Sequence, residues 1–304
     1  MRCTDCDLVH ATAGYAPRFL DEHYADRADR APTSSPGTAT PRPQSERKRQ
    51  ALALYDRLSE GRLSTPRAGT LALDIGCGIG LLLDLLRERG YTTVGIERSG
   101  AALRAREAGH RIHAIDIEGE VSLDERFGVI TLTHLLEHLR RPEDALRWVG
   151  RHLRPEGLAV IEVPNWDDLA RPLWGPRYRP LELGDHVSFF QRHTLAALCE
   201  RAGLRLHTLW SAAQGRTLVF PSLLTGLDHG KSVLHRLRGR SSTPAEDGVG
   251  VAATRTVTGP ARWRHTAVTA ALTGLDRLDP LLESLTGRAW THGANLVAVV
   301  EPGT

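Results

Sequence analysis

The sequence lacks several features that would place it in a specialised class of protein. No run of about 18 or more apolar residues occurs, so we expect no membrane-spanning helix. The first residues contain no apolar stretch of the kind that marks a signal peptide. The 4 cysteines among 304 residues are too few for a disulfide framework. Together these absences favour a protein of the reducing cytoplasm.

A large excess of charge of one sign is also missing. The 39 lysines and arginines face 36 acidic residues, which gives a formal net charge of +3. This balance gives no reason to expect nucleic acid or an anionic membrane as the main partner. Internal repeats are absent as well, and a chain of this length is expected to fold into one or two domains with a sizeable core.

The most informative stretch is glycine-rich and spans residues 71–80. It begins as a short apolar strand, ends that strand in Asp74, and then places Gly76, Gly78 and Gly80 at every second position. Glycines leave no side chains along one edge of the turn, so a ligand can approach the backbone closely. The helical segment that follows, 81–89, adds unpaired N–H groups and a positive dipole end. The pattern therefore predicts a nucleotide-like cofactor.

Downstream of this turn, apolar strand patterns and helical patterns alternate along the chain. This rhythm predicts an α/β fold with a mostly parallel sheet and helices on both faces. Ligands of such sheets bind beyond the carboxyl ends of the strands, so functional residues are expected directly after strands. The expected strands are 91–96, 112–115, 127–133, 158–163 and 204–209, and the expected helices are 44–60, 99–108, 142–153 and 194–202.

The order Asp74, Gly76, Gly78, Gly80 resembles motif I of the class I methyltransferases that depend on S-adenosylmethionine (SAM). The dinucleotide fingerprint would instead need a glycine at position 81, which is Leu81. The resemblance implies a Rossmann-like, seven-stranded sheet whose last strand, 295–300, is antiparallel and lies between the fifth and sixth. It also suggests an N-terminal extension over 1–43, a methyltransferase domain formed by 44–210 and 289–304, and a helical or flexible insert over 211–288.

Several residues after the first strands match cofactor-binding positions of that family. Glu97 ends the second strand, where a carboxylate can accept hydrogen bonds from both ribose hydroxyls. The resemblance implies that Asp116 bonds the adenine amine, that Ile117 contacts the ring, and that Arg98 flanks the adenosine. The full expected SAM site is Asp74, Gly76, Cys77, Gly78, Gly80, Glu97, Arg98, Asp116, Ile117 and Thr133.

A histidine-rich segment follows the fourth strand, where the transferred methyl group would point. Either His134 or His186 is expected to act as general base, since the imidazole pKa suits removal of a hydroxyl proton near neutral pH. Some relatives bind a divalent cation at this place. The corresponding set here would be His134, Glu137, His138 and His186, an alternative to the metal-free site that we expect.

The first hypothesis for function is methyl transfer from SAM to a small-molecule acceptor, at a hydroxyl oxygen, by in-line displacement. The acceptor is either free or part of a glycan or lipid-linked molecule, with Trp166, Trp174 and Tyr178 as candidate pocket walls. The alternatives are a SAM-binding scaffold or regulator without activity, and an NAD(P)-dependent oxidoreductase. The sequence does not specify the oligomeric state.

Two further segments have a structural and a functional interpretation. Cys3 and Cys6 form a C-x-x-C that resembles half of a zinc-ribbon knuckle, and the alternative is an N-terminus without metal. Residues 263–288 show an apolar stripe at helical spacing. The stripe either packs on the sheet or forms a lid over a lipophilic substrate.

Overall fold

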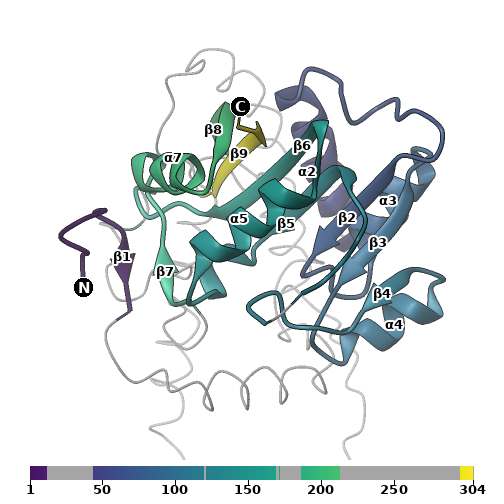
Figure 1. Ribbon diagram of the computed structural model, residues 1–304, viewed down its shortest axis with the longest axis horizontal. Helices are drawn as coiled ribbons and strands as arrows, with labels where there is room; N and C mark the ends of the chain where they lie inside the picture. The colour runs from purple at the N-terminus through teal and green to yellow at the C-terminus, as the bar shows by residue number, and fades with distance from the viewer. Residues whose placement is uncertain (12–43, 120, 169–170, 172–185, 213–294, 304) are drawn as a thin grey trace, which may run out of the picture.

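The computed structural model of the protein describes residues 1–11, 44–119, 121–168, 171, 186–212 and 295–303 (Figure 1). Most of the expected N-terminal extension (12–43), nearly all of the expected insert with its apolar stripe (213–288), and the aromatic residues Trp174 and Tyr178 lie outside this part. The described residues include the glycine-rich stretch and the histidine segment after the fourth expected strand.

A seven-stranded sheet forms the centre of the molecule, with the strand order β4-β3-β2-β5-β6-β9-β8. Every pair among the first five strands of this order is parallel. The strands are β2 (Leu71–Ile75), β3 (Thr92–Ile96), β4 (Arg111–His113), β5 (Phe127–Thr133), β6 (Leu153–Pro164), β8 (Leu204–Ala212) and β9 (Asn295–Pro302).

The last strand confirms the topology that the resemblance implied. β9 pairs antiparallel with β6 on one side and with β8 on the other. The most visible differences from the sequence-based expectation are lengths: β6 begins five residues before the expected 158, and β4 covers only part of 112–115. The Rossmann-like fold class is therefore confirmed.

Helices cover both faces of the sheet (Figure 1). Leu52 of the leading helix packs with Leu82 of the next helix in one apolar cluster, and Leu146 packs with Leu195 in the other. Pro142 occupies the first turn of its helix, where its missing N–H removes no hydrogen bond. The helices are α2 (Gln44–Leu58), α3 (Leu81–Glu88), α4 (Ala101–Glu107), α5 (Pro142–His152) and α7 (Arg192–Arg201), with a 3₁₀ turn, η1 (Leu136–His138).

The inner strands divide their side chains between the two faces with the two-residue period of a strand. In β9, Leu296, Ala298 and Val300 belong to the cluster under α5 and α7, while Val297 and Val299 belong to the cluster under α2. All of these side chains are fully buried. Because both faces of the strand are buried, its sequence is a continuous apolar run.

A small second sheet joins the N-terminus to the region before α7. β1 (Val9–His10) pairs antiparallel with β7 (Ser188–Phe189), and Leu8 is buried in the main core. Cys3 and Cys6 lie in the turn before β1 as free thiols. Among the described residues they belong to no group of three or more metal-binding side chains, so zinc binding at this turn stays a prediction.

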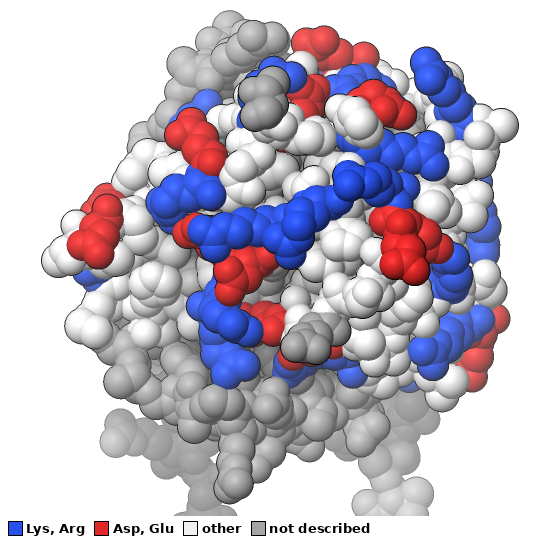
Figure 2. Space-filling model, in the orientation of Figure 1, with Lys and Arg blue, Asp and Glu red and all other residues white. Residues whose placement is uncertain are grey.

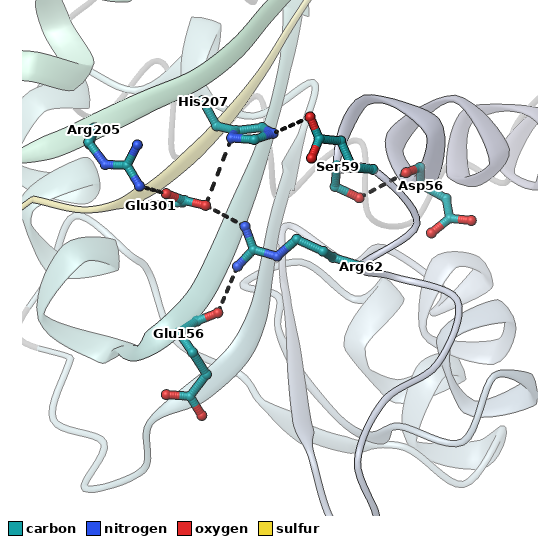
Figure 3. Close-up of polar contacts among 8 residues, drawn as sticks. Asp56, Ser59, Arg62, Glu156, Arg205, His207 and Glu301 are labelled. Carbon is teal, nitrogen blue, oxygen red and sulfur yellow. Dashed lines mark hydrogen bonds and ion pairs between the residues drawn. The ribbon is translucent and has the colours of Figure 1, made fainter.

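The edge of the sheet at the amino ends of the parallel strands carries a network of ion pairs, which we call the amino-edge network (Figure 3). Its centre is Glu301 of β9, whose carboxylate accepts hydrogen bonds from Arg62 and Arg205. Arg62 also donates to the carbonyl of Glu156 at 2.7 Å, and His207 lies 3.9 Å from Glu301. The network fastens the segment after α2 to β6, β8 and β9.

The surface above α5 carries charges of both signs (Figure 2). Lysine and arginine side chains form a band across this face, and acidic side chains lie beside it. Arg147 pairs with Asp144 at 3.1 Å, and Arg201 pairs with Glu143 at 3.1 Å. Such exposed pairs contribute little stability.

None of the helices in the described part of the chain is long and apolar enough to span a bilayer.

Candidate active site

The glycine turn after β2 adopts the backbone conformation that its sequence requires. Gly76, Gly78 and Gly80 all have positive φ angles, of 74°, 55° and 87°. A Cβ on Gly80 would approach His110 to 2.8 Å, and one on Gly76 would approach Leu135 to 3.2 Å. A Cβ on Gly78 would meet nothing within 4 Å. The middle of the turn is therefore open, and a ligand can reach its backbone there.

Glu97, directly after β3, contacts the open side of this turn. One carboxylate oxygen accepts the N–H of Gly78 at 2.8 Å, and the other accepts the N–H of Ser99 at 2.8 Å. Each oxygen keeps a further lone pair. The expected acceptor of two ribose hydroxyls thus lies against the glycine turn, as its position after β3 predicts.

The next expected cofactor residues lie after β3 and β4. Arg98 and Asp116 form an ion pair at 2.6 Å, and Asp116 also accepts the N–H of Glu118 at 3.0 Å. The side chain of Ile117 is buried in the main core. The structure thus brings Arg98 and Asp116 together and directs most of Ile117 inward.

Asp74 and Cys77 are buried under the turn. Asp74 is 1% exposed and accepts the hydroxyl hydrogen of Thr131 at 2.6 Å. Burial raises the pKa of Asp74 to about 6, and the nearby Lys48 ammonium and the Thr131 hydroxyl limit this rise. Burial also raises the pKa of the Cys77 thiol, so this side chain is a neutral packing group.

Lys48 is a site residue that the sequence did not reveal. It extends from α2 and donates to the Thr133 hydroxyl at 2.8 Å, at the carboxyl end of β5. This contact brings a cation to the edge where the glycine turn lies. The helical pattern of 44–60 predicted that α2 packs on the sheet, but lysine at an exposed helical position is too common to stand out.

His134, directly after β5, lies between two carboxylates, and its expected role as general base stays a prediction. Its Nδ1 lies 3.3 Å from Glu137, and its Nε2 lies 3.5 Å from Glu162. Burial opposes the charged form, but the hydrogen bonds and charges of Glu137 and Glu162 outweigh it and raise the pKa of His134 to about 10. The two carboxylates therefore favour the protonated form of the ring.

Glu137, His138 and His186 form a second group beside His134. One potential ligand atom from each lies within 4.8 Å of the others. The rings of His138 and His186 meet edge to face with centroids 4.8 Å apart. Glu137 is 1% exposed, and within the described residues its Oε2 has no hydrogen-bond donor. The arrangement suits either a carboxylate-supported base or a metal ligand set, and His134 is not part of the group.

Glu162 of β6 connects these residues to two distant elements. It accepts hydrogen bonds from Tyr55 of α2 and Asn295 of β9, and it faces His134. These interactions lower the pKa of Glu162 to about 2 although burial opposes ionisation. We call Tyr55, Glu162, Asn295, His134 and Glu137 the carboxyl-edge network. A lone acid inside the apolar run 158–163 is the sequence signal that could have identified Glu162.

The expected acceptor wall is described only at Trp166. Its ring lies 4.8 Å from that of Phe189, and the guanidinium of Arg171 stacks over it at 4.4 Å. Packing from Phe189 and Arg171 gives the ring a fixed orientation. Whether it contacts an acceptor stays a prediction.

Comparisons with known proteins concern the family of the chain and do not test individual site residues. The profile of a family described as "Methyltransferase domain" matches residues 44–209. The ubiquinone biosynthesis O-methyltransferase of Caulobacter sp. (strain K31) is 34% identical over 126 residues, covering 39% of this chain and 49% of that protein. The enzyme of the same name from Pseudomonas entomophila (strain L48) is 31% identical over 153 residues, covering 46% of this chain and 66% of that protein. The chain thus spans about half to two thirds of the length of these relatives.

Solved structures include more distant relatives. A SAM-dependent methyltransferase from Archaeoglobus fulgidus is 17% identical, with a TM-score of 0.48 over 83% of this chain and 94% of that chain. A likeness at this level adds nothing to the assignment.

Proposed function

Because this chain belongs to the family of SAM-dependent methyltransferases, we propose that it transfers a methyl group from SAM to a hydroxyl oxygen of a small-molecule acceptor. The observation that carries the proposal is the turn at Gly76, Gly78 and Gly80, which is open at Gly78 and supported by Glu97. When bound, SAM supplies a methyl group on a sulfonium that needs no further activation.

The residues of the turn fit such a cofactor. Glu97 retains acceptor capacity on both oxygens, and its hydrogen bonds to Gly78 and Ser99 fix its orientation. Gly80 precedes α3 without a side-chain cap, so the first N–H groups of that helix remain available to a polar ligand. Lys48 adds a positive charge close to Thr133. These groups bind and orient, and orientation supplies much of the acceleration in an in-line displacement.

An oxygen acceptor is favoured by the curated relatives. Both of these proteins are named ubiquinone biosynthesis O-methyltransferase. We extend only the oxygen chemistry to this chain, and leave the acceptor as a hydroxylated small molecule that is either free or part of a glycan or lipid-linked molecule.

The proton of the acceptor hydroxyl passes to His186 in this proposal. His186 is 7% exposed and lies beside His138 and Glu137. The negative charge of Glu137 favours the protonated form of the His186 imidazole. His134 is assigned a different task, because its ring nitrogens already face two carboxylates. We expect His186→Ala to lower turnover by about 10²-fold while SAM affinity changes little. Unchanged turnover would remove His186 from the mechanism.

The metal-assisted version of the site remains a defined alternative. Glu137, His138 and His186 would supply the ligands, and the cation would lower the pKa of the acceptor hydroxyl. Full activity after EDTA treatment and desalting is expected for the metal-free mechanism. Loss of activity that Mg²⁺, Mn²⁺ or Zn²⁺ restores would replace it with the metal-assisted one.

The function itself is tested by binding and by turnover. Calorimetry is expected to show binding of SAM and S-adenosylhomocysteine but not of NAD or NADP. Incubation with methyl-labelled SAM and a panel of phenols, catechols and sugars is expected to give an alkali-stable methyl ether. Binding of NAD alone would favour an oxidoreductase. SAM binding without transfer to any hydroxylated acceptor would favour the scaffold alternative.

A further inference from the structure

Glu162 is an ionised side chain at a position where burial makes ionisation unfavourable. It lies near the carboxyl end of β6, is 8% exposed, and its neighbours in β6 are fully buried aliphatic residues. A buried carboxylate is tolerated only when hydrogen bonds and opposite charge replace its hydration. Tyr55 and Asn295 supply hydrogen bonds and His134 supplies the opposite charge.

These partners come from widely separated parts of the chain. Tyr55 is 0% exposed on α2, and Asn295 is 3% exposed at the start of β9. β9 is fixed at this point by its pairing with Pro164 and with Ala212. Glu162 is therefore held by elements on both sides of β6, and its orientation follows from the completed sheet.

His134 connects Glu162 to Glu137. Its N–H donates to the Glu162 carbonyl at 2.8 Å, and its φ of 55° is in the left-handed region that histidine rarely adopts. The ring then bridges Glu162 and Oε1 of Glu137. Glu137 also belongs to the group that contains His138 and His186, in which one ligand atom from each residue lies within 4.8 Å of the others.

We propose that Glu162 is a positioning residue for the methyl transfer: it holds His134, and through His134 the Glu137 carboxylate, so that Glu137 orients His186 toward the acceptor hydroxyl. The inference rests on the proposed function, since it assigns a role within the same reaction. Glu162 does not touch the reacting atoms in this scheme. The raised pKa of His134 and the lowered pKa of Glu162 agree with it.

The direct test compares Glu162→Gln with Glu301→Gln. Glutamine at 162 keeps the size of the side chain but removes the charge and one acceptor oxygen, so His134 and Glu137 lose their fixed geometry. We expect kcat to fall by about 10²-fold while the KM for SAM changes less than about twofold. Glu301 is also a carboxylate that accepts hydrogen bonds from two cations, but these arginines are exposed and it belongs to the amino-edge network. Its variant is expected to keep the kcat of the wild type.

A graded variant guards against a loss of folding in Glu162→Gln. Tyr55→Phe removes one donor and leaves the carboxylate in place, and we expect kcat to fall by about tenfold, again without a change in the KM for SAM. Equal values of kcat for Glu162→Gln and Glu301→Gln would overturn the proposal. The proposal would also be overturned if kcat fell by the same factor in Tyr55→Phe and in Glu301→Gln.

A readout without turnover separates this inference from the proposed function. In spectra of protein labelled with ¹⁵N-histidine, Glu162→Gln is expected to move the ring signals of His134 and His186, and Glu301→Gln is expected to move neither. Unmoved His186 signals in Glu162→Gln would overturn the positioning role even if methyl transfer is confirmed. Moved signals in a protein that methylates no hydroxyl would support the coupling and overturn only the reaction assigned to it.

Discussion

The two polar networks at opposite edges of the sheet join the same parts of the chain in different ways. The amino-edge network centres on Glu301 of β9, and its arginine partners are 34% and 61% exposed. The carboxyl-edge network centres on Glu162 of β6, and its donors Tyr55 and Asn295 are 0% and 3% exposed. Water can replace the partners of Glu301, but it cannot reach Tyr55 or Asn295. The amino-edge network links separate elements of the fold, whereas the carboxyl-edge network sets the orientation of its side chains.

The largest expected difference between the edges is in stability. Glu162→Ala leaves the Tyr55 hydroxyl and the Asn295 amide buried without their acceptor and removes one of the two carboxylates that face His134, which costs about 3 kcal/mol of unfolding free energy. Glu301→Ala returns two exposed guanidiniums to water and costs about 1 kcal/mol. Urea denaturation of both variants measures the difference. Equal losses would show that the contrast in burial has no energetic meaning.

The second difference is in the response to pH. The pKa of His134 is raised from 6.5 to about 10, so its stabilising contribution is complete below 6.5 and is lost as the pH rises through about 10. The pKa of Glu162 is lowered from 4.5 to about 2, so its contribution is present above 4.5 and is lost as the pH falls through about 2.

We therefore expect the unfolding free energy of the wild type to decline between pH 7 and 10. His134→Gln removes the titrating ring and is expected to flatten this decline. Arg205→Ala serves as a control from the amino-edge network and is expected to keep it. An equally steep decline in His134→Gln would assign the alkaline limb to other groups.

A smaller effect is expected at Lys48. Lys48→Met removes the hydrogen bond to Thr133 and a cation that holds down the pKa of Asp74. We expect a loss of about 1 kcal/mol in unfolding free energy and titration of Asp74 at a higher pH. The matched variant Lys48→Arg keeps the charge, and denaturation curves from pH 5 to 8 compare the two. The role given to Lys48 is wrong if both variants have the same pH dependence.

The smallest effect is expected for Arg205→Ala at neutral pH. Its guanidinium is 61% exposed, and Glu301 keeps its bond from Arg62. A loss of about 0.5 kcal/mol is expected from thermal unfolding, with no change in turnover. A loss as large as that of Glu162→Ala would remove the distinction between the edges.

The sequence predicted the fold, and it predicted where one half of the candidate site lies in that fold. Asp74, the glycines and Glu97 follow from local rules, because a tight turn after a buried strand needs glycine and a parallel sheet aligns the ends of its strands. The carboxyl-edge network does not follow from such rules. Tyr55, Glu162 and Asn295 meet only through the packing of α2 and the placement of β9 between β6 and β8.

His134 shows the same limit in its chemistry. The sequence places an imidazole after β5, and an ordinary imidazole is a suitable base. Its protonation state depends on Glu137, three residues ahead, and on Glu162 in the neighbouring strand. The first of these carboxylates is local in sequence, and the second becomes a neighbour only in the folded sheet.

The position of β9 has a consequence for the order in which the molecule is completed. β9 lies between β6 and β8, yet it is synthesised after both of them. On the ribosome, β8 therefore has no neighbour in the sheet until residues 295–302 emerge, and Asn295 reaches Glu162 only at that moment. Closure over so long a separation in sequence is expected to be slow. A nascent chain that already carries the glycine turn and Glu97 is thus able to acquire the cofactor half of its site well before the half that directs the chemistry.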